Sequence, residues 1–353
     1  MPIRLLIVDD SAVARRMLAE FVAGDPEIVV VGTAATPLIA REKIKALSPD
    51  VISLDIEMPQ MDGLQFLARI MALRPMPVVV VSALSEAGTE TSLRALELGA
   101  VDVMAKPGSA GAANLPELAA EYRRKLKAAA RARVGARPLG APAAASAPAM
   151  PQSQAFADGL IALGASTGGV EALGIILEAL PAGIPPIVVT QHMPRGFTAN
   201  FARRLATRCA VRVVEAAPDM KLLQGLVAIA PGDAHLEVVR KAGALVCRLS
   251  DTSPVSGHRP SVDVMFASVA RLALPRRAAA ILTGMGRDGA AGLAALRQSG
   301  ALTLGQTEAS CVVYGMPRAA REAGAVMQEL PLVEIGPALL APFCLEDTDA
   351  LHV

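Results

Sequence analysis

Cysteine is scarce in this sequence, and its spacing excludes two kinds of site. The chain of 353 residues has four cysteines, and no two of them form a C-x-x-C pair. A disulfide framework or a zinc site would need paired or closely spaced cysteines, so the sequence predicts neither. We expect reduced and mostly buried thiols at Cys209, Cys247, Cys311 and Cys344.

Long apolar runs are also missing, although 53% of the residues are hydrophobic. The longest runs span only a few residues, such as 78–81, whereas a membrane-spanning helix needs about 20. Charged residues bracket the first apolar run at Arg4, Asp9 and Asp10, which is not the pattern of a signal peptide. We therefore expect a cytoplasmic protein that is not inserted in a membrane.

A strong net charge is the third absence. Lys and Arg number 34, and Asp and Glu number 33, so the composition predicts neither a nucleic-acid-binding tail nor an acidic disordered segment. The length allows about two or three domains. These constraints favour a soluble enzyme or regulator that binds no nucleic acid.

The first hundred residues alternate between apolar strands and amphipathic helices. Such alternation predicts an α/β fold with a doubly wound, five-stranded parallel sheet of the flavodoxin-like type. The expected helices between the first strands cover residues 12–23 and 37–47. The five expected strands cover residues 3–10, 28–34, 51–56, 77–83 and 101–107.

Polar residues gather at the C-terminal ends of these strands. In open α/β sheets that edge is where ligands bind. Three carboxylates beside a lysine can hold a hard divalent cation, and Mg²⁺ is the usual one where a phosphoryl group is involved. The residues concerned are Asp9, Asp10, Asp55, Ser82 and Lys106.

These motifs resemble the receiver domains of two-component response regulators over about residues 3–125. The segment LDIEMPQMDG looks like the phosphorylation site. The resemblance implies that Asp55 accepts the phosphoryl group, that Asp9 and Asp10 complete an Mg²⁺ pocket, that Ser82 is the hydroxyl switch, and that Lys106 contacts the phosphoryl oxygens. One position departs from the pattern. Where an aromatic residue often stands, three residues before the lysine, this chain has Val103.

A basic stretch and a linker follow the expected first domain, residues 1–125. The stretch from 123 to 133 is rich in Lys and Arg, and we interpret it as a solvated helix face, with partner docking as the alternative. Alanine and proline then dominate without large apolar residues, a composition that cannot bury a core. We expect a flexible linker at 126–156, a second domain at 157–345 and a C-terminal tail at 346–353.

A serine follows the first strand of the second domain. Residues 160–163 form a short apolar run, and 170–180 have apolar residues at helical spacing. Ser166 therefore lies in a strand-to-helix turn, where backbone N–H groups favour developing negative charge. Gly164, Ser166 and Gly168 also match the G-x-S-x-G pattern of nucleophile elbows. The alternative is a glycine-rich turn in which the serine caps the helix.

Two further strand ends supply a base and an acid. His192 ends the strand within residues 186–194, and Asp288 lies in the loop after the strand that begins at residue 278. In a doubly wound, Rossmann-like and mostly parallel sheet, such positions converge on one crevice. A serine needs a base, and the base needs a carboxylate to hold its tautomer, so the three residues together predict acyl transfer.

Three other histidines compete with His192 for the role of base. His352 is next to last in the chain, at an end that we expect to fray. His235 follows Pro231-Gly232-Asp233 in an expected hairpin of two strands, where a surface or substrate-rim position is the simplest interpretation. His258 lies in a polar loop that can line the cleft, so we regard it as the reserve base.

A dinucleotide site is the main alternative to an esterase. Gly284, Gly286 and Gly289 form G-x-G-x-x-G between a strand and a helix. That motif expects an acidic residue at the end of the next strand, to hold a ribose hydroxyl. Here the next strand ends in Gly305 and Gln306. We therefore favour a role in which these glycines let the backbone approach the substrate.

The second domain resembles the catalytic domain of chemotaxis receptor methylesterases, the CheB family, over about residues 158–345. The motifs that carry the resemblance are GASTGG, QHMP, GMGRDG and SCVVYGMP. It implies a Ser166 nucleophile, a His192 general base and an orienting Asp288, with Thr167 and Met285 shaping the oxyanion site. No departure is seen in the triad motifs.

The resemblance also implies a function and partners. The reaction would be hydrolysis of glutamate γ-methyl esters, and deamidation of particular glutamines, on the cytoplasmic helices of chemoreceptors. A chemotaxis histidine kinase would supply the phosphoryl group to Asp55. Mg²⁺ would serve the receiver, and the esterase chemistry would need no cofactor.

Overall fold

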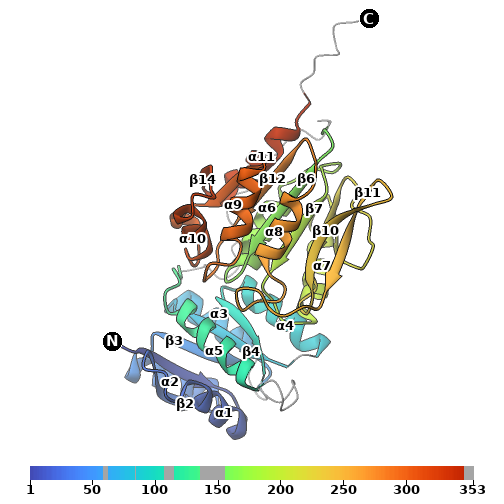
Figure 1. The fold of residues 1–353 in the computed structure, drawn as a ribbon. Helices are drawn as coiled ribbons and strands as arrows, with labels where there is room; N and C mark the ends of the chain where they lie inside the picture. Colours follow the sequence, from blue (N-terminus) through green and yellow to red (C-terminus); the bar gives the residue numbers. More distant parts are fainter. Residues whose placement is uncertain (59–62, 84, 107–114, 136–155, 346–353) are drawn as a thin grey trace, which may run out of the picture. The chain divides into compact units, whose positions relative to one another are not determined.

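The fold consists of two units, each built around its own sheet (Figure 1). The computed structural model describes residues 1–58, 63–83, 85–106, 115–135 and 156–345. Contacts divide the chain into Met1–Ala144 and Ala145–Val353. Most of the expected linker, at 136–155, and the expected tail, at 346–353, lie outside the described residues.

The first unit has a five-stranded parallel sheet in the order β2-β1-β3-β4-β5. The expectation of a doubly wound, flavodoxin-like sheet is thereby confirmed. Strands β3 and β4 are buried along their whole length, as expected for central strands with helices on both faces. The strands are β1 (Ile3–Val8), β2 (Ile28–Ala34), β3 (Val51–Asp55), β4 (Val78–Ser82) and β5 (Asp102–Ala105).

The helices of the first unit begin at recognisable capping residues. Ser11 caps the first helix by accepting from the N–H of Ala14, and Thr36 caps the second, which has Pro37 in its first turn. Both helices match their expected bounds within one residue. The helices are α1 (Ala12–Val22), α2 (Pro37–Leu47), α3 (Gly63–Leu73), α4 (Glu86–Glu97) and α5 (Leu115–Ala129).

Helix α5 continues past residue 125, where we expected the first domain to end. Leu126 and Ala129 are fully buried, so the last turn still belongs to the core of this unit. Its basic side chains are engaged within the same unit: Lys127 Nζ lies 2.9 Å from carboxylate oxygens of both Asp25 and Glu27. These contacts favour an ordinary ion-paired helix face over a docking surface.

The second unit has a seven-stranded parallel sheet in the order β14-β13-β12-β6-β7-β9-β8, with a separate antiparallel pair β10-β11. A larger, mostly parallel α/β domain is thereby confirmed. The strands are β6 (Leu160–Ala165), β7 (Ile187–Gln191), β8 (Arg212–Glu215), β9 (Leu226–Ile229), β10 (His235–Lys241), β11 (Ala244–Ser250), β12 (Arg277–Ile281), β13 (Leu302–Gln306) and β14 (Gln328–Leu330).

The hairpin expected around residues 231–233 is wrong. Strand β9 is fully buried and pairs in parallel with β7 and β8, while β10 pairs with β11. The hairpin turn is instead formed by Ala242 and Gly243, both with positive φ (49° and 83°). Two such residues give the turn twist that antiparallel strands require.

Helices cover the larger sheet, and α8 and α9 lie side by side over one face of it (Figure 1). Phe266 of α8 and Leu293 of α9 are fully buried in the core cluster that also contains Ala162 of β6. The helices are α6 (Gly169–Glu178), α7 (Phe197–Ala206), α8 (Val262–Ala270), α9 (Ala290–Gln298), α10 (Met316–Glu322) and α11 (Leu332–Leu340), with short 3₁₀ turns at Glu308–Ser310 and Ala341–Phe343.

The four cysteines carry no disulfide, and Cys247 and Cys311 are buried while Cys209 and Cys344 are partly buried. Burial and the charge of Glu178 raise the pKa of Cys209 to about 11, and burial raises the pKa of Cys247 to about 12. Thiols with such pKa values stay protonated at neutral pH and are poor nucleophiles. The expectation of reduced, largely buried thiols is confirmed.

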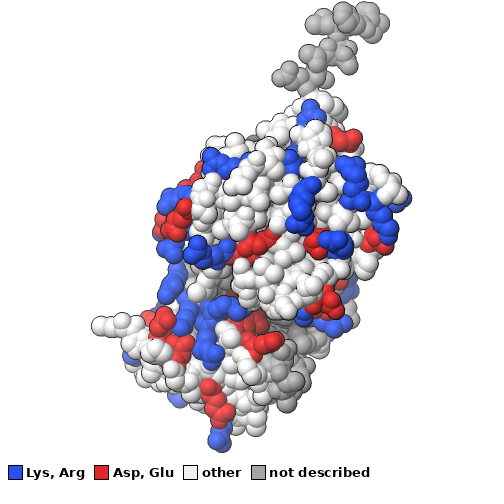
Figure 2. Space-filling view, in the orientation of Figure 1, with Lys and Arg blue, Asp and Glu red and all other residues white. Residues whose placement is uncertain are grey.

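Charges of both signs are mixed on the surface of each unit. Figure 2 shows basic and acidic residues interspersed, as the near balance of 34 basic and 33 acidic residues leads one to expect. Within the described ranges, each helix is too short or too polar to cross a membrane.

Candidate active site

Three strand ends of the second unit bring Ser166, His192 and Asp288 together. Strand β6 pairs with β7 on one side and with β12 on the other. Ser166 follows β6, His192 follows β7, and Asp288 lies in the loop after β12. The chain leaves β6 toward β7 and later returns on the opposite side at β12, so this edge is a topological switch point, where open α/β sheets bind ligands.

The turn after β6 is fixed by backbone hydrogen bonds. The N–H of Ser166 donates to the carbonyl of Thr283 (3.0 Å), and the N–H of Gly169 donates to the carbonyl of Ser166 (2.7 Å). Gly168, with φ of 79°, is the capping residue of α6 and has no side chain to cap it. The hydroxyl of Ser166 therefore does not cap α6, which removes the structural alternative considered for this serine.

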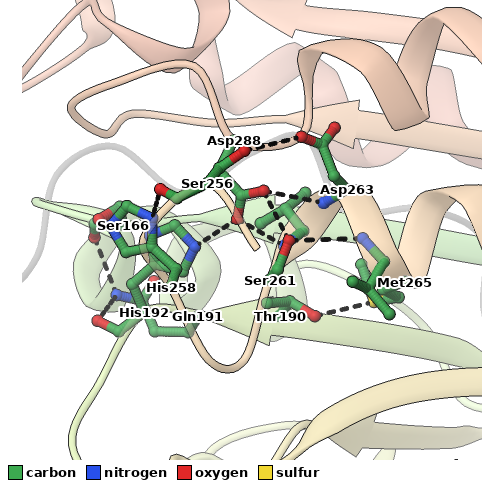
Figure 3. A network of polar contacts seen from close by, with 12 residues as sticks. Ser166, Thr190, Gln191, His192, Ser256, His258, Ser261, Asp263, Met265 and Asp288 are labelled. Carbon is green, nitrogen blue, oxygen red and sulfur yellow. Dashed lines mark hydrogen bonds and ion pairs between the residues drawn. The ribbon is translucent and has the colours of Figure 1, made fainter. Parts of the chain in front are cut away.

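His192 and Asp288 are joined by a short hydrogen bond. His192 Nε2 lies 2.7 Å from Asp288 Oδ2. An ionised carboxylate can only accept, so Nε2 carries the hydrogen and Nδ1 holds the lone pair. Nδ1 is buried and has no hydrogen-bond partner within the described part of the chain. Figure 3 shows Ser166 beside this imidazole, so Nδ1 is the nitrogen left to act as a base.

Asp288 is almost completely buried and held by the start of α8. Its carboxylate accepts from the hydroxyl of Ser261 (2.7 Å) and from the backbone N–H groups of Val262 (2.7 Å) and Asp263 (3.1 Å). Burial alone would raise the pKa of Asp288, but the contact with His192 and these hydrogen bonds outweigh it and hold the pKa well below its usual range. The group is therefore an anion at neutral pH, at the positive end of a helix dipole.

His235 is not at the surface or the substrate rim, as we expected, but fully buried. Its Nδ1 accepts from the N–H of Ser261 (3.1 Å) and its Nε2 donates to the carbonyl of Ser253 (3.2 Å). Because the hydroxyl of Ser261 in turn donates to Asp288, His235 helps to hold Asp288 in position through Ser261. Sequence reasoning missed this role. The only signal in the chain was its place at the start of an alternating strand.

The other two histidines have different outcomes. His258 comes from the polar loop before α8 and does line the site, as expected. Its ring stacks on that of His192 with 3.9 Å between centroids and 5° between planes. His352 lies outside the described residues.

The glycine-rich loop after β12 contacts the serine turn. A Cβ on Gly284 would come within 2.7 Å of Ser166 Cβ and 2.4 Å of Met316 Sδ. Only glycine lets the backbone come this close to Ser166. Met285, the next residue, is partly buried, and Thr167 is nearly buried, with its carbonyl accepting from Thr283 Oγ1 (3.0 Å).

Gln306, at the position where a dinucleotide site needs an acid, has a structural role. It is fully buried. Its Oε1 accepts from the N–H of Thr283 (2.8 Å), and its Nε2 donates to the carbonyl of Ser310 (2.7 Å). The side chain of Gln306 thus holds in place Thr283, whose carbonyl accepts from the N–H of Ser166. These contacts count against a ribose-binding role for the end of β13.

The first unit has an acidic pocket at the C-terminal edge of its sheet. Asp55 and Asp9 are buried, and Lys106 Nζ lies 2.7 Å from Asp55 Oδ2 and 3.1 Å from Asp9 Oδ2. Burial opposes the charge of Lys106, but the two carboxylates outweigh it and raise the pKa of the amine. Three members of the expected strand-end cluster, Asp9, Asp55 and Lys106, therefore lie in contact.

A divalent cation fits this acidic pocket. Oxygen atoms of Asp9, Asp10 and Asp55 all lie within 4.8 Å of one another. Burial, and after it the charge of Asp55, raises the pKa of Asp9, and a cation beside these carboxylates would favour their ionised form. A donor set made only of carboxylate oxygens is suited to Mg²⁺.

Ser82 and Val103 are the two remaining residues of the first unit for which the sequence predicted a role. The hydroxyl of Ser82 donates to the carbonyl of Gly88 in α4 (3.2 Å), so in this state it is bound to the helix that follows β4. Val103 lies in β5 and is 1% exposed.

Family models match both units. Residues 5–114 match the model for response regulator receiver domains, and residues 161–339 match the model for CheB methylesterases. The two matched segments contain the acidic pocket and the site around Ser166.

Relatives match nearly the whole chain. A protein-glutamate methylesterase/protein-glutamine glutaminase from Pseudomonas aeruginosa is 52% identical, over 96% of this chain and 97% of its own. One from Caulobacter vibrioides is 54% identical over the same shares. The crystal structure of the CheB methylesterase catalytic domain of Thermotoga maritima is 36% identical over 52% of this chain and 97% of its own, with a TM-score of 0.50. The chain therefore belongs to the CheB methylesterase family, with a response regulator receiver domain in front of the esterase domain.

Proposed function

We propose that the second unit hydrolyses glutamate γ-methyl esters on the cytoplasmic helices of chemoreceptors and deamidates particular glutamines there. The relatives are named for both reactions. The observation that carries the proposal is the His192–Asp288 pair, with His192 Nδ1 buried and open beside Ser166.

In the first half of the reaction, Ser166 Oγ attacks the ester carbonyl carbon and His192 Nδ1 takes its proton. The imidazolium that forms is stabilised by Asp288, which stays ionised because its pKa is low. Collapse of the tetrahedral intermediate breaks the bond to the methoxy oxygen. Nδ1–H returns the proton to that oxygen, and methanol leaves an acyl-enzyme on Ser166.

In the second half, His192 Nδ1 takes a proton from water, whose oxygen attacks the acyl carbon. Collapse of the second tetrahedral intermediate breaks the bond to Ser166 Oγ, Nδ1–H returns the proton to that oxygen, and a glutamate side chain is released. A glutamine follows the same path, except that ammonia leaves in the first step. Both reactions place a new carboxylate on the receptor surface and so change the charge there.

The developing oxyanion needs preorganised donors. The backbone N–H groups of Thr167, at the start of α6, and of Met285, in the glycine-rich loop, are our candidates. Support comes from the hydrogen bonds that fix both turns and from the close approach that Gly284 allows. We expect the esterase chemistry to need no cofactor.

The first unit is the regulatory half of the proposal. Asp55 accepts a phosphoryl group from a chemotaxis histidine kinase, with Mg²⁺ held by Asp9, Asp10 and Asp55 to offset the charge of the incoming group. Lys106, already 2.7 Å from Asp55, contacts the phosphoryl oxygens. We propose that phosphorylation gates the esterase and that the protein works in the cytoplasm, where its substrate helices lie.

Methanol release from methylated receptors tests the enzymatic half. Ser166→Ala and His192→Ala should each lower kcat at least about 10³-fold, and the double variant should be little worse than the worse single. Thr207→Ala, an exposed hydroxyl at the end of α7, should keep normal activity. Near-normal turnover in His192→Ala, together with a loss of turnover in His258→Ala, would show that His258 and not His192 is the base.

A further inference from the structure

The second histidine of the site, His258, stacks on the proposed base. Its ring lies parallel to that of His192, with centroids 3.9 Å apart and planes within 5° (Figure 3). We infer that His258 is a positioning residue, which holds the His192 imidazole in the one plane where Nε2 meets Asp288 and Nδ1 faces Ser166. This inference rests on the proposed function, because it assigns a support to the proposed base.

The loop before α8 fixes the ring of His258. Its Nδ1 lies 2.9 Å from the carbonyl oxygen of Ser256, and since a carbonyl only accepts, Nδ1 carries a hydrogen. The backbone of His258 also exchanges two hydrogen bonds with Val255, of 2.9 and 3.0 Å. The ring is therefore held in place before any substrate binds.

His192 needs such a support. Asp288 holds it at one nitrogen through one hydrogen bond, while Nδ1, at the other side of the ring, has no partner among the described residues. A single bond leaves the ring free to tilt out of plane, which would turn the lone pair of Nδ1 away from Ser166. A flat ring in van der Waals contact blocks the tilt on that face, and offset stacking is favourable for aromatic rings.

Stacking also couples the charges of the two rings. A positive charge on His258 would oppose the imidazolium that forms on His192 during acyl transfer. Of the acidic groups nearby, Asp288 has a carboxylate oxygen within 4.8 Å of a ring nitrogen of each histidine, and Asp263 Oδ2 lies 3.5 Å from Ser256 Oγ. Arg259 donates to the carbonyls of Asp251 and Thr252, and the exposed Arg287 neighbours Asp288 in the chain.

The test compares His258→Phe with His258→Ala in the full-length chain, using p-nitrophenyl acetate as the probe. Phenylalanine keeps a flat ring but no nitrogen. We expect His258→Ala to lower kcat about 10- to 100-fold, because a misplaced reacting group costs that much, with KM little changed. His258→Phe should recover kcat to within about threefold. Thr207→Ala, the exposed hydroxyl at the end of α7, is the control and should leave kcat unchanged.

Rescue by a flat ring separates positioning from a loss of folding. A variant that is partly unfolded loses kcat whichever side chain replaces the histidine, whereas recovery in His258→Phe requires a flat ring at this place. Thermal unfolding of each variant checks that it is folded.

Two results would overturn the inference. Wild-type kcat in folded His258→Ala would mean that the ring does not position His192. Equal losses in His258→Phe and His258→Ala would mean that a nitrogen of His258, and not its flat face, is what the reaction needs.

Failure of the proposed function gives a different result. If Ser166→Ala still turned over the probe, Ser166 would not be the nucleophile, and this result would say nothing about the role of His258. In that case the nitrogen NMR spectrum of His192 decides. We expect one tautomer, protonated at Nε2, in wild type and in His258→Phe, and a mixture in His258→Ala; an unchanged tautomer in His258→Ala would overturn the inference.

Discussion

Asp288 belongs to two structures at once. It binds His192, and it accepts hydrogen bonds from the hydroxyl of Ser261 and from two backbone N–H groups at the start of α8. The same negative charge that would stabilise an imidazolium therefore also caps a helix. A substitution at this position affects stability as well as catalysis, and the two effects have to be measured separately.

Asp288→Asn should lower the melting temperature in a pH-dependent way. The folded-state pKa of Asp288 lies below its unfolded value of about 3.9. Such a group contributes stability above the unfolded pKa and loses that contribution as the pH falls toward the folded one. Thermal unfolding should show a clear gap between wild type and variant at pH 7 that narrows below about pH 4.

The matched control for this substitution is Asp158→Asn, an exposed carboxylate before β6. Its melting temperature should follow that of wild type at both pH values. A gap for Asp288→Asn that stayed constant from pH 7 to pH 3 would show that the charge of Asp288 is not what stabilises the fold.

Sequence reasoning identifies the residues that follow strands and misses those that support them. Ser166, His192 and Asp288 could be chosen because parallel strand ends converge, whatever the details of packing. His235 could not, because its partner Ser261 is 26 residues further on and the contact depends on how β10 packs beside α8. For the same reason the sequence could not predict that His258 stacks on His192, although it did predict that His258 can line the cleft.

At the scale of elements, the glycine-rich loop after β12 determines how closely two strand ends approach. Gly284→Ala should reduce kcat by about 100-fold, because its Cβ would stand 2.7 Å from Ser166 Cβ and push the loop away. Methanol release measures the loss. Gly174→Ala is the matched control: its Cβ would meet only Glu178 Oε1 at 3.5 Å inside α6, and activity should stay normal.

The same loop allows a test of the dinucleotide alternative. The buried side chain of Gln306 is committed to Thr283 and Ser310 and leaves no acid to hold a ribose hydroxyl. Isothermal titration of the purified protein with NAD should therefore show no binding. Saturable binding with the affinity of a dehydrogenase would revive an oxidoreductase role for this G-x-G-x-x-G loop.

Pairing between strands is where the sequence-based prediction of elements was wrong. Residues 226–229 and 235–241 read as a hairpin because a Pro-Gly-Asp turn separates them. A fully buried apolar strand is equally suited to the interior of a parallel sheet, and β9 lies there. Local turn signals predict that a chain reverses, but the competition among all strands decides the partner.

At the scale of the whole molecule, each unit has its own sheet and its own site. The proposed gating predicts that the unphosphorylated receiver inhibits the esterase. Removing residues 1 to about 150 should then raise the esterase rate above that of the unphosphorylated whole. The decisive measurement is the rate of the intact protein, with and without a small phosphodonor, against the isolated second unit. If the fragment were no faster than the unphosphorylated intact protein, the receiver would not be an inhibitor, and phosphorylation could act only by raising the esterase rate directly.

The size of such a switch is limited by the contacts that the phosphoryl group makes. Moving a closed state from 1:99 to 99:1 takes about 5.5 kcal/mol of differential binding. In this receiver Val103 stands where an aromatic side chain often does, so no ring at this position can rotate. We expect the hydroxyl of Ser82, which donates to Gly88 of α4, to be the main link, and a shift smaller than this full range.

Ser82→Ala should therefore separate phosphorylation from activation. Asp55 and Lys106 stay in place, so Mg²⁺-dependent phosphorylation should proceed as in wild type. The variant lacks the hydroxyl that would leave Gly88 for the phosphoryl oxygens and pull the start of α4 with it, so most of the rise in esterase rate should be lost. Phosphate incorporation and methanol release, measured on the same samples, give both quantities. Asp55→Asn is the control that should lose both, whereas full activation in Ser82→Ala would place the link between phosphorylation and the esterase elsewhere in the receiver.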